Sequence, residues 1–506
     1  MAVENSIVRS MASKFAASKL LLSANADISA ISNADIDALI AKLVEMNPEV
    51  SKGIVVVDNS MISAAMINLE LEKAPMPIGI NRSSEFKPLA AEIEADYRME
   101  KRPIETTGGS GGVADFVTYF RSRLSKMRAI IDTHISMTGG ALSNLGTLKD
   151  FTSGREVNLI GIVSRKITTK NGNILLEIED DTDTAKIMFM NGTSKRSKEL
   201  FENAGSIIND EVLAIHGKIS GPFVIADQII WPDVPVKTQK KTEEDIAIAF
   251  ISDVHVGSRL FMDKNFSRMI NWLNGNVESS QKALAGKIKY LVLAGDAADG
   301  IGVYPNQDKD LAISDMYMQY KLLFNFLESI PDYIHVFVLP GNHDSVQRAE
   351  PQPELPTSLV KDFKADNIHF LSNPSFFSLH GLNVAAYHGT SLDSIIASIP
   401  NNSYAKPEKA MVELLKRRHL SPIYGGNIIV PSKNDSMVIE KAPDILHMGH
   451  IHKNGITNYH GVSIVNSGTW QARTDFQVRQ GHIPTPCIMP VLETKTSKFV
   501  SIDFNG

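Results

Sequence analysis

The sequence contains a single cysteine, Cys487, among its 506 residues. One cysteine can form neither an intrachain disulfide nor a cysteine-rich zinc site. A metal ion in this chain would therefore have to be held by His, Asp, Glu or Asn side chains. A chain without disulfides is typical of a reducing compartment, and we expect the protein to be cytoplasmic.

Long hydrophobic runs and an excess of positive charge are also missing. No stretch approaches the roughly 20 apolar residues that a membrane span needs, and the run at residues 20–22 is too short for a signal peptide. The net charge of −6 excludes a generally basic coat for nucleic acid, so contact with DNA or RNA would be local, metal-mediated or shared with a partner. The hydrophobic fraction of 43% and the charged fraction of 21% are typical of a globular chain, here long enough for two to four domains.

The first part of the chain alternates helical patterns with linker composition. Residues 33–46 predict an amphipathic helix with Asn33 as N-cap. This helix is either a docking module for a partner or part of a small helical domain, which we place at residues 1–73. Residues 74–112 lack a Gly-Lys-Ser/Thr after their glycines, so we interpret them as a flexible linker rather than a phosphate-binding loop. Helical spacing predicts a helical connector over residues 113–149.

Residues 150–237 change to the two-residue period of strands. The pair Asn171-Gly172 predicts a hairpin turn, and a helical stretch at residues 198–203 interrupts the strands. This order is expected for an OB-fold, a small five-stranded barrel. Such barrels bind single strands or serve as protein–protein modules, and the scarcity of aromatic residues for base stacking favours a scaffold here.

The last region, residues 245–506, alternates apolar runs with helical patterns, which predicts an α/β layered sheet. Polar side chains follow the ends of several apolar runs: Asp253 and His255, Asp296, Asn342 and His343, His388, and His450 and His452. Asp-x-His and His-x-His spacing would place both side chains on the same side of an extended segment. Groups that follow successive strands are expected to converge on one edge of the sheet.

This set of carboxylate, imidazole and carboxamide groups suits Mn, Fe, Zn or Ni better than Mg, which prefers oxygen ligands. The set is too large for one tetrahedral ion and fits two ions that share a bridging ligand. Two ions about 3.5–4 Å apart can activate a hydroxide and clamp the oxygens of a phosphoryl group. The residues therefore predict phosphoester hydrolysis.

The motif order "DVH", "GD", "GNHD", "YHG", "GHIH" resembles the calcineurin-like metallophosphoesterase superfamily. The resemblance implies a first metal held by Asp253, His255, Asp296 and His452. It implies a second metal held by Asp296, Asn342, His388 and His450, with Asp296 bridging. His343 matches a non-ligand histidine that stabilises the transition state or protonates the leaving oxygen. The implied cofactor is two divalent ions, Mn²⁺ foremost, with Fe, Zn, Ni and Mg as alternatives.

Three neighbouring ionisable residues are not assigned as ligands. We interpret His447, on the strand before "GHIH", as a core residue or a support for a ligand. Asp299 and Asp344 are interpreted as loop carboxylates that orient or solvate. Serine/threonine phosphatases of the superfamily carry "GDxVDRG" and "GNHE", whereas this chain reads "GDAADGIG" and "GNHD", which argues against a protein phosphatase.

The stretches around the motifs are more specific than the motifs themselves. "LPGNHDSVQRAEPQP", "PEKAMVELLKRRHLSPIYGGN", "DSMVIEKAPDILHMGHIHKNG" and "NSGTWQARTDFQ" resemble the small subunits of archaeal family D DNA polymerases, most closely from about residue 150 onwards. The implied fold is multidomain: an N-terminal helical region, an OB-fold barrel and a C-terminal calcineurin-like phosphoesterase α/β sandwich. The related B subunits of eukaryotic replicative polymerases have lost most metal ligands, whereas this chain keeps the whole pattern.

The resemblance implies a metal-dependent 3′–5′ exonuclease that proofreads within a DNA polymerase complex and scaffolds its large subunit. The implied partners are the large catalytic subunit, DNA primer ends that are single-stranded or mismatched, and a sliding clamp. Two alternatives stay open: a stand-alone phosphodiesterase or repair nuclease, and a catalytically silent scaffold. The "KRRH" cluster at residues 416–419 either contacts a phosphate backbone or is an exposed helix end without a role.

Overall fold

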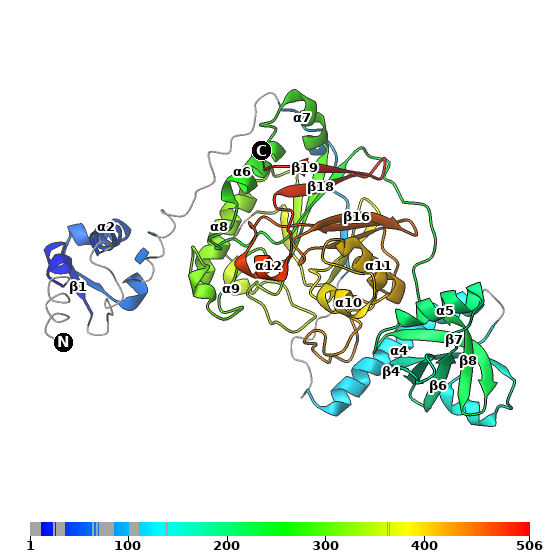
Figure 1. The fold of residues 1–506 in the computed structure, drawn as a ribbon. Helices are drawn as coiled ribbons and strands as arrows, with labels where there is room; N and C mark the ends of the chain where they lie inside the picture. Colours follow the sequence, from blue (N-terminus) through cyan, green and yellow to red (C-terminus); the bar gives the residue numbers. More distant parts are fainter. Residues whose placement is uncertain are drawn as a thin grey trace.

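The computed structural model describes residues 12–23, 26, 36–62, 65, 66, 69, 86–100, 111–136, 140–361, 363 and 365–505. They form an N-terminal unit, a β-barrel with an adjoining helix, and a large α/β sandwich (Figure 1). Within these residues, none of the helices combines the length and the apolar composition that a membrane crossing requires.

The N-terminal unit has a core of its own, built on helix α2 (Ile36–Met46) and a two-stranded parallel sheet of β1 (Leu20–Leu22) and β2 (Val55–Val57). A 3-10 turn, η1 (Pro48–Ser51), follows α2. The prediction of a purely helical domain was wrong on the sheet, because consecutive Leu and Val residues favour strands once their alternate side chains are buried. The predicted cap Asn33 lies outside the described residues.

Residues 86–100 are not a flexible linker, which corrects that part of the predicted 74–112 segment. They form η2 (Leu89–Ala91) and strand β3 (Tyr97–Glu100), which pairs with β13 of the sandwich. The Phe86 side chain is 6% exposed, and the backbone N–H of Asp96 donates to the Tyr290 hydroxyl at 2.9 Å. These apolar anchors and backbone bonds outweigh the Pro and Ser content that suggested a tether. Residues 74–85 and 101–110 lie outside the described part of the chain.

Truncations can test this boundary. Deleting residues 1–85 removes a unit with its own core and should leave the unfolding of the sandwich unchanged. Deleting residues 1–100 also removes Phe86 and β3. Loss of a buried Phe costs about 3 kcal/mol or more, and each kcal/mol shifts the Tm of a domain this size by about 2–4 °C. We expect a drop of about 6 °C or more in calorimetry; equal melting temperatures for the two truncations would show that the segment contributes nothing.

The barrel closes in the strand order β4-β5-β6-β8-β7. Helix α4 (Val113–Ser136) and η3 (Leu145–Asp150) precede it, as the predicted connector requires. Its elements are β4 (Glu156–Thr168), β5 (Ile174–Glu179), β6 (Thr184–Phe189), α5 (Lys195–Gly205), β7 (Val212–Ser220) and β8 (Phe223–Ile230). The hairpin turn at Asn171-Gly172 is confirmed, with Gly172 at φ 76°. A small five-stranded barrel interrupted by one helix is therefore confirmed.

The sandwich contains two stacked six-stranded sheets. The first has the order β12-β11-β10-β9-β18-β19 and the second β16-β17-β15-β14-β13-β3. The strands of the first sheet are β9 (Ala247–Ile251), β10 (Ile288–Ala294), β11 (His335–Leu339), β12 (Ile368–Phe370), β18 (Ile488–Glu493) and β19 (Lys498–Asp503). Those of the second, besides β3, are β13 (Ser375–Leu379), β14 (Leu382–Ala386), β15 (Ile445–Met448), β16 (Asn454–Tyr459) and β17 (Val462–Ser467).

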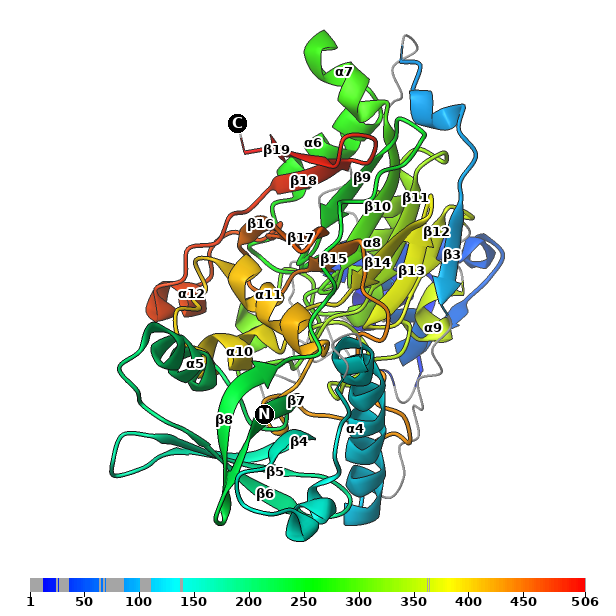
Figure 2. The ribbon, with the colours of Figure 1, turned by 90° about the vertical axis from the view of Figure 1, so that its right-hand side faces the viewer.

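Helices cover the outer face of each sheet (Figure 2). The helices and the remaining 3-10 turn of this region are α6 (Asp263–Leu273), α7 (Ser279–Ala285), η4 (Gln307–Lys309), α8 (Met316–Glu328), α9 (Thr357–Val360), α10 (Leu392–Ser398), α11 (Pro407–Arg417) and α12 (Asp475–Gln480). Every residue of β9 and β10 is buried, because helices lie on one side of these parallel strands and the second sheet lies on the other. The predicted α/β layers are confirmed. The strand pattern alone predicted one sheet, whereas the α/β sandwich implied by the family resemblance agrees with the two sheets found.

The barrel, α4 and the sandwich meet at a buried polar joint. The Arg123 side chain on α4 is 1% exposed and donates to the Asp435 carboxylate at 2.8 Å, to the Pro422 carbonyl at 2.7 Å and to the Asp210 carbonyl at 3.0 Å. Burial raises the pKa of the Asp435 carboxyl, but the charges of His419 and Arg123 outweigh it and hold that pKa far below its ordinary value. One guanidinium therefore links three segments.

The "KRRH" cluster belongs to this joint, so both interpretations offered for it were wrong. Arg417 is buried and forms an ion pair with Glu211 of the barrel at 2.5 Å. The Lys416 ammonium lies 3.7 Å from the centroid of the Trp231 ring. Basic residues at a helix end look solvated in sequence, and only the position of the barrel against α11 reveals that these side chains are buried.

We expect Arg123→Ala to destabilise the chain by about 3–5 kcal/mol, because it leaves the buried Asp435 carboxylate without its cation. Arg121→Ala is the matched control, since Arg121 lies on the same helix and is exposed. Urea unfolding followed by circular dichroism measures both. Equal midpoints for the two variants would mean that the pair adds nothing to stability.

Candidate metal centre

The polar side chains that follow the strands come from both sheets. Asp253 and His255 follow β9, Asp296 follows β10, and Asn342 follows β11, all in the first sheet. His388, His450 and His452 follow β14 and β15 in the second sheet. The expectation of one sheet edge was wrong. The groups meet because the two layers stack with these strand ends together.

The backbone at these positions is left-handed, not extended. Positive φ angles occur at Asp253 (51°), His255 (52°), Asp296 (51°), His450 (68°) and His452 (57°). Strand alternation is therefore the wrong reason for Asp253 and His255 to lie together, although they do. Non-glycine residues in this region are uncommon and cost about 1–3 kcal/mol each. Such strain concentrates where the chain must aim side chains at a functional site.

One group of side chains gathers around Asp253. The His452 Nε2 lies 3.3 Å from Asp253 Oδ1 and 3.1 Å from His255 Nε2. The His255 Nε2 also lies 3.8 Å from Asp296 Oδ2. All four side chains are buried, and within the described part of the chain Asp253 Oδ1 has no hydrogen-bond partner. A buried carboxylate oxygen facing imidazole nitrogens is the arrangement that a cation site requires.

A second group shares Asp296 with the first. The His388 Nε2 lies 3.3 Å from Asp296 Oδ2 and 3.0 Å from Asn342 Oδ1. The His450 ring lies beside it, with ring centroids 5.2 Å apart. The His450 Nε2 is 2.9 Å from Asp393 Oδ2, which leaves Nδ1 as the nitrogen available to a ligand. Asp296 Oδ2 therefore lies between the histidines of the two groups.

Backbone amides orient both carboxylates in the same way. The N–H of His343 donates to Asp296 Oδ1 at 2.9 Å, and the N–H of His450 donates to Asp253 Oδ2 at 2.9 Å. Each aspartate thus keeps one oxygen toward the histidines. Close approach needs the motif glycines, because a Cβ on Gly341 would lie 2.2 Å from Asp296 Oδ1 and one on Gly449 would lie 2.4 Å from Asp253 Oδ2.

His343 lies against this site, as the sequence predicted. Its Nδ1 donates to the Asp299 carbonyl oxygen at 2.8 Å, so Nε2 is the ring nitrogen left to accept or release a proton. Its ring centroid lies 4.7 Å from that of His255. The ligand atoms of His255, Asp296 and His343 are close enough together to hold an ion, so metal content must be measured to distinguish an acid from a ligand at this position.

The residues left unassigned take the supporting places expected of them. Asp299 Oδ1 lies 2.9 Å from His255 Nδ1 and orients that ring. Asp344 accepts hydrogen bonds from the backbone of Ala297, Ala298 and Gly341, which fixes the loop. His447 is fully buried, with Nε2 2.9 Å from the Ser467 hydroxyl. Burial lowers the pKa of His447 to about 3, so it is a neutral core residue.

Two supporting residues were missed by the sequence reasoning. Asp393, at the start of α10, contacts His450. Gln477, in the capping box of α12 with Thr474, places its amide nitrogen 2.9 Å from His452 Nδ1. An acidic residue in a first helical turn and a Gln at N3 are common capping choices. Neither therefore carries a signal in the sequence that separates it from an ordinary helix start.

The raised pKa values of two histidines show that the buried carboxylates attract positive charge to the site. Burial lowers the pKa of His388, but the charge and hydrogen bond of Asp296 and the charge of Asp253 outweigh it and raise that pKa to about 10. Burial likewise lowers the pKa of His255, and Asp299 with the other carboxylates raises it to about 9. The buried carboxylates thus favour cations, which either protons on the histidines or divalent ions can supply.

Comparisons with known proteins agree with these observations. A family model described as the B subunit of DNA polymerases alpha and epsilon matches residues 248–456. The chain is 40% identical over 417 residues to the DNA polymerase II small subunit of Methanocaldococcus jannaschii, covering 81% of this chain and 69% of that one. It is 38% identical over 450 residues to the DNA polymerase II small subunit of Archaeoglobus fulgidus, covering 88% of each.

Among solved structures, an archaeal phosphodiesterase matches with 15% identity, 51% of this chain and 99% of that chain covered, and a TM-score of 0.25. A likeness this weak supports no statement about activity. The sequence relatives are decisive, because their identity extends over most of both chains. The chain therefore belongs to the family of DNA polymerase II small subunits, the small subunits of archaeal family D DNA polymerases.

Proposed function

We propose that this small subunit is a two-metal 3′–5′ exonuclease that removes mismatched nucleotides from primer ends and scaffolds a large catalytic subunit. The observation that carries the proposal is the pair of side-chain groups joined through Asp296 Oδ2, with His343 beside them. A chain that served only as a scaffold would have no need to bury several carboxylates and histidines at strained backbone positions.

The residues fit two divalent ions. Asp253, His255, Asp296 and His452 would hold one ion, and Asp296, Asn342, His388 and His450 would hold the other, with Asp296 shared. The orphaned oxygen of Asp253 and the nitrogen–carboxylate donor set support this assignment, and the same donor set favours Mn²⁺ over Mg²⁺. When bound, such ions lower the pKa of a coordinated water and neutralise charge on a phosphate.

The protein's own groups would do the rest of the chemistry. The Asp299 carboxylate and the Ala294 carbonyl hold the imidazoles of His255 and His388 by their Nδ1 atoms, which fixes the ring orientations. As an imidazolium cation held through Nδ1–H by the Asp299 carbonyl, His343 would present Nε2–H to the 3′ oxygen that leaves phosphorus.

The scaffold part of the proposal rests on the barrel and the joint. We infer that the five-stranded barrel is an OB-fold, because one helix separates its third and fourth strands in the chain. The buried ion pairs at Arg123 and Arg417 would present the barrel and the sandwich to the large subunit as one unit. Exposed aromatic residues on the barrel are few, which favours a protein contact over stacking on single strands.

Degradation of labelled primers tests the proposal. The full chain, with and without the co-purified large subunit, is incubated with Mn²⁺ and single-stranded or mismatched primers. A 5′ label should give a ladder of shortened strands, and a 3′ label should be released at once as a mononucleotide. Absence of hydrolysis in both preparations would leave a scaffold without nuclease activity, and a ladder from the 3′-labelled strand would reverse the polarity.

A further inference from the structure

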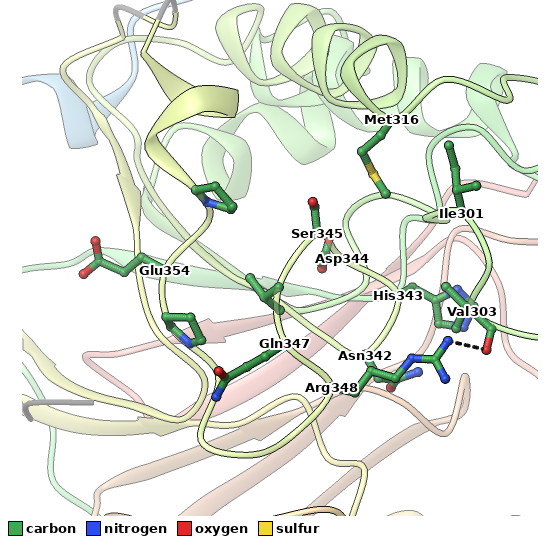
Figure 3. Close-up of a pocket in the computed structure, with 13 residues that line it drawn as sticks. Ile301, Val303, Met316, Asn342, His343, Asp344, Ser345, Gln347, Arg348 and Glu354 are labelled. Carbon is green, nitrogen blue, oxygen red and sulfur yellow. Dashed lines mark hydrogen bonds between the residues drawn. The ribbon is translucent and has the colours of Figure 1, made fainter. Parts of the chain in front are cut away.

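A pocket of about 450 Å³ opens beside Asn342 and His343 (Figure 3). Its walls come from the loop after β10, from the start of α8, and from the loop that follows "GNHD". The apolar lining residues are Ile301, Val303, Met316, Val346, Pro353 and Pro356. Two residues of the proposed centre, Asn342 and His343, line this pocket, so whatever fills it lies next to the proposed site of hydrolysis.

The pocket is a built feature of the fold. Gly300, at φ 74°, brings its loop so close to the "GNHD" loop that a Cβ on it would lie 2.1 Å from the His343 carbonyl oxygen. Arg348 connects the same two loops, since its Nη2 donates to the carbonyls of Gly302 and Val303 at 2.8 Å each. Both contacts fix the distance between the walls.

The lining indicates the chemical class of the occupant. Six of the thirteen lining residues are apolar, and the other seven bring polar groups to the same space: Asn342, His343, Asp344, Ser345, Gln347, Arg348 and Glu354. Pockets of about 300–1,000 Å³ that combine apolar walls with convergent polar groups bind small organic molecules. A free phosphate or a metal ion would not need apolar walls, whereas a nucleobase has two apolar faces and a polar edge. The exposed Arg348 guanidinium at the pocket supplies a positive charge suited to a phosphate of the strand, while the exposed Glu354 carboxylate in the same lining opposes it in part.

We propose that this pocket receives the base of the penultimate nucleotide at the 3′ end of the strand, an inference that rests on the proposed nuclease function. During hydrolysis the oxygen of water bonds to phosphorus and its proton passes to solvent. The bond from phosphorus to the 3′ oxygen breaks, and that oxygen takes a proton from His343 Nε2. The 3′ oxygen belongs to the penultimate nucleoside, so this nucleoside must lie on the His343 side, where the pocket is.

A penultimate base seated in this pocket would restrict which primer ends can be trimmed. A base that is still paired with the template cannot enter a pocket bounded by two loops. The penultimate nucleotide must therefore unpair together with the terminal one before hydrolysis. Selection for mismatched ends would then follow from the lower cost of opening two base pairs when one of them is already disrupted.

Abasic substitution tests the assignment in the full chain. Three 5′-labelled single strands are compared: a natural strand, one abasic at the penultimate position, and one abasic at the terminal position. Stacking of one base on an aromatic ring is worth roughly tenfold or more in affinity, and we expect the aliphatic walls of this pocket to contribute about the lower end of that range. For penultimate abasic strands we expect kcat/KM to fall by roughly that factor. The Kd of these strands, measured by anisotropy in EDTA, should rise by the same factor, and terminal abasic strands should change little in either quantity.

Variants connect that loss to the pocket. Met316→Trp fills the pocket and Ile301→Ala removes part of its wall. In both variants, kcat/KM for the natural strand divided by kcat/KM for the penultimate-abasic strand should therefore approach one. Tyr317→Trp adds the same ring at the next residue of α8, outside the lining, and should keep the wild-type ratio. Because Ile301 is 45% exposed, its variant should fold even if Met316→Trp does not.

The outcomes separate the two proposals. The pocket assignment is overturned if the wild-type protein binds natural and penultimate-abasic strands with equal Kd in EDTA. It is also overturned if terminal abasic strands lose more affinity than penultimate abasic ones. Unchanged ratios in Met316→Trp and Ile301→Ala, combined with weaker association with the large subunit, would assign the pocket to a protein contact instead. Absence of hydrolysis of every strand and of bis(4-nitrophenyl) phosphate removes the nuclease function, and the inference that rests on it.

Discussion

Asp296→Ala should abolish hydrolysis of DNA and reduce the bound metal of the purified chain. The carboxylate of Asp296 is the group that the two sets of side chains share, with Oδ2 3.8 Å from His255 Nε2 and 3.3 Å from His388 Nε2. Removing a bridging ligand affects both ions at once, and two-metal hydrolysis needs both. Metal content by mass spectrometry and primer degradation with Mn²⁺ are the two measurements.

Asp308→Ala provides the matched control for this substitution. Asp308 is an exposed carboxylate on the nearby turn η4, so its loss removes the same charge without touching the centre. It should leave both metal content and hydrolysis at wild-type levels. If Asp296→Ala keeps its metal and its activity, the assignment of a shared carboxylate is wrong.

His343→Ala should lose roughly 10²–10⁴-fold in kcat while keeping its metal, since this is the range that general acid catalysis contributes. The imidazole is fixed through Nδ1 by the Asp299 carbonyl, so only Nε2 can deliver a proton. The complex with the large subunit should continue to polymerise DNA, but mismatched primer ends should no longer be trimmed. Single-turnover degradation and metal analysis measure the two effects separately.

His460→Ala is the comparison for His343→Ala, because His460 lies in the turn between β16 and β17 and is not one of the residues of the centre. Loss of metal in His343→Ala would make His343 a ligand, in line with its closeness to His255 and Asp296. Unchanged removal of mismatches would mean that proofreading resides elsewhere in the complex.

The apolar pattern of the sequence predicted the strand ends well, but only the family resemblance implied the sandwich. Runs such as β9 and β10 are recognisable because buried parallel strands are continuously apolar, and the polar residues that follow them are recognisable with them. The division of those strands between two sheets could not be predicted, since apolar runs do not record which strand pairs with which. Asp253 and His255 lie close together as expected. They do so through left-handed backbone, whereas the prediction assumed the alternating side chains of an extended strand.

Burial that depends on another domain was the other failure. Arg417 and Arg418 look like a solvated helix end, yet both are buried, because Glu211 and the barrel lie against α11. Phe86 and Tyr97 occur in a stretch of linker composition. A few apolar residues in such a stretch do not show that it supplies the edge strand of a sheet formed much later in the chain. In both cases the partner lies far along the chain, so no local window contains the signal.

The division of the centre between two stacked sheets makes catalysis sensitive to packing far from it. The contacts of His388 with Asp296 and of His452 with Asp253, each 3.3 Å, connect residues of opposite layers. The layers themselves are held together by apolar side chains, such as Phe337 and Phe377, whose stacked rings lie 5.1 Å apart. Apolar contacts have no preferred direction, so a cavity in that interior lets one layer slide over the other by fractions of an ångström. A substitution that only removes volume between the sheets would then alter the reaction itself, and mutational surveys would score it as a damaged active site.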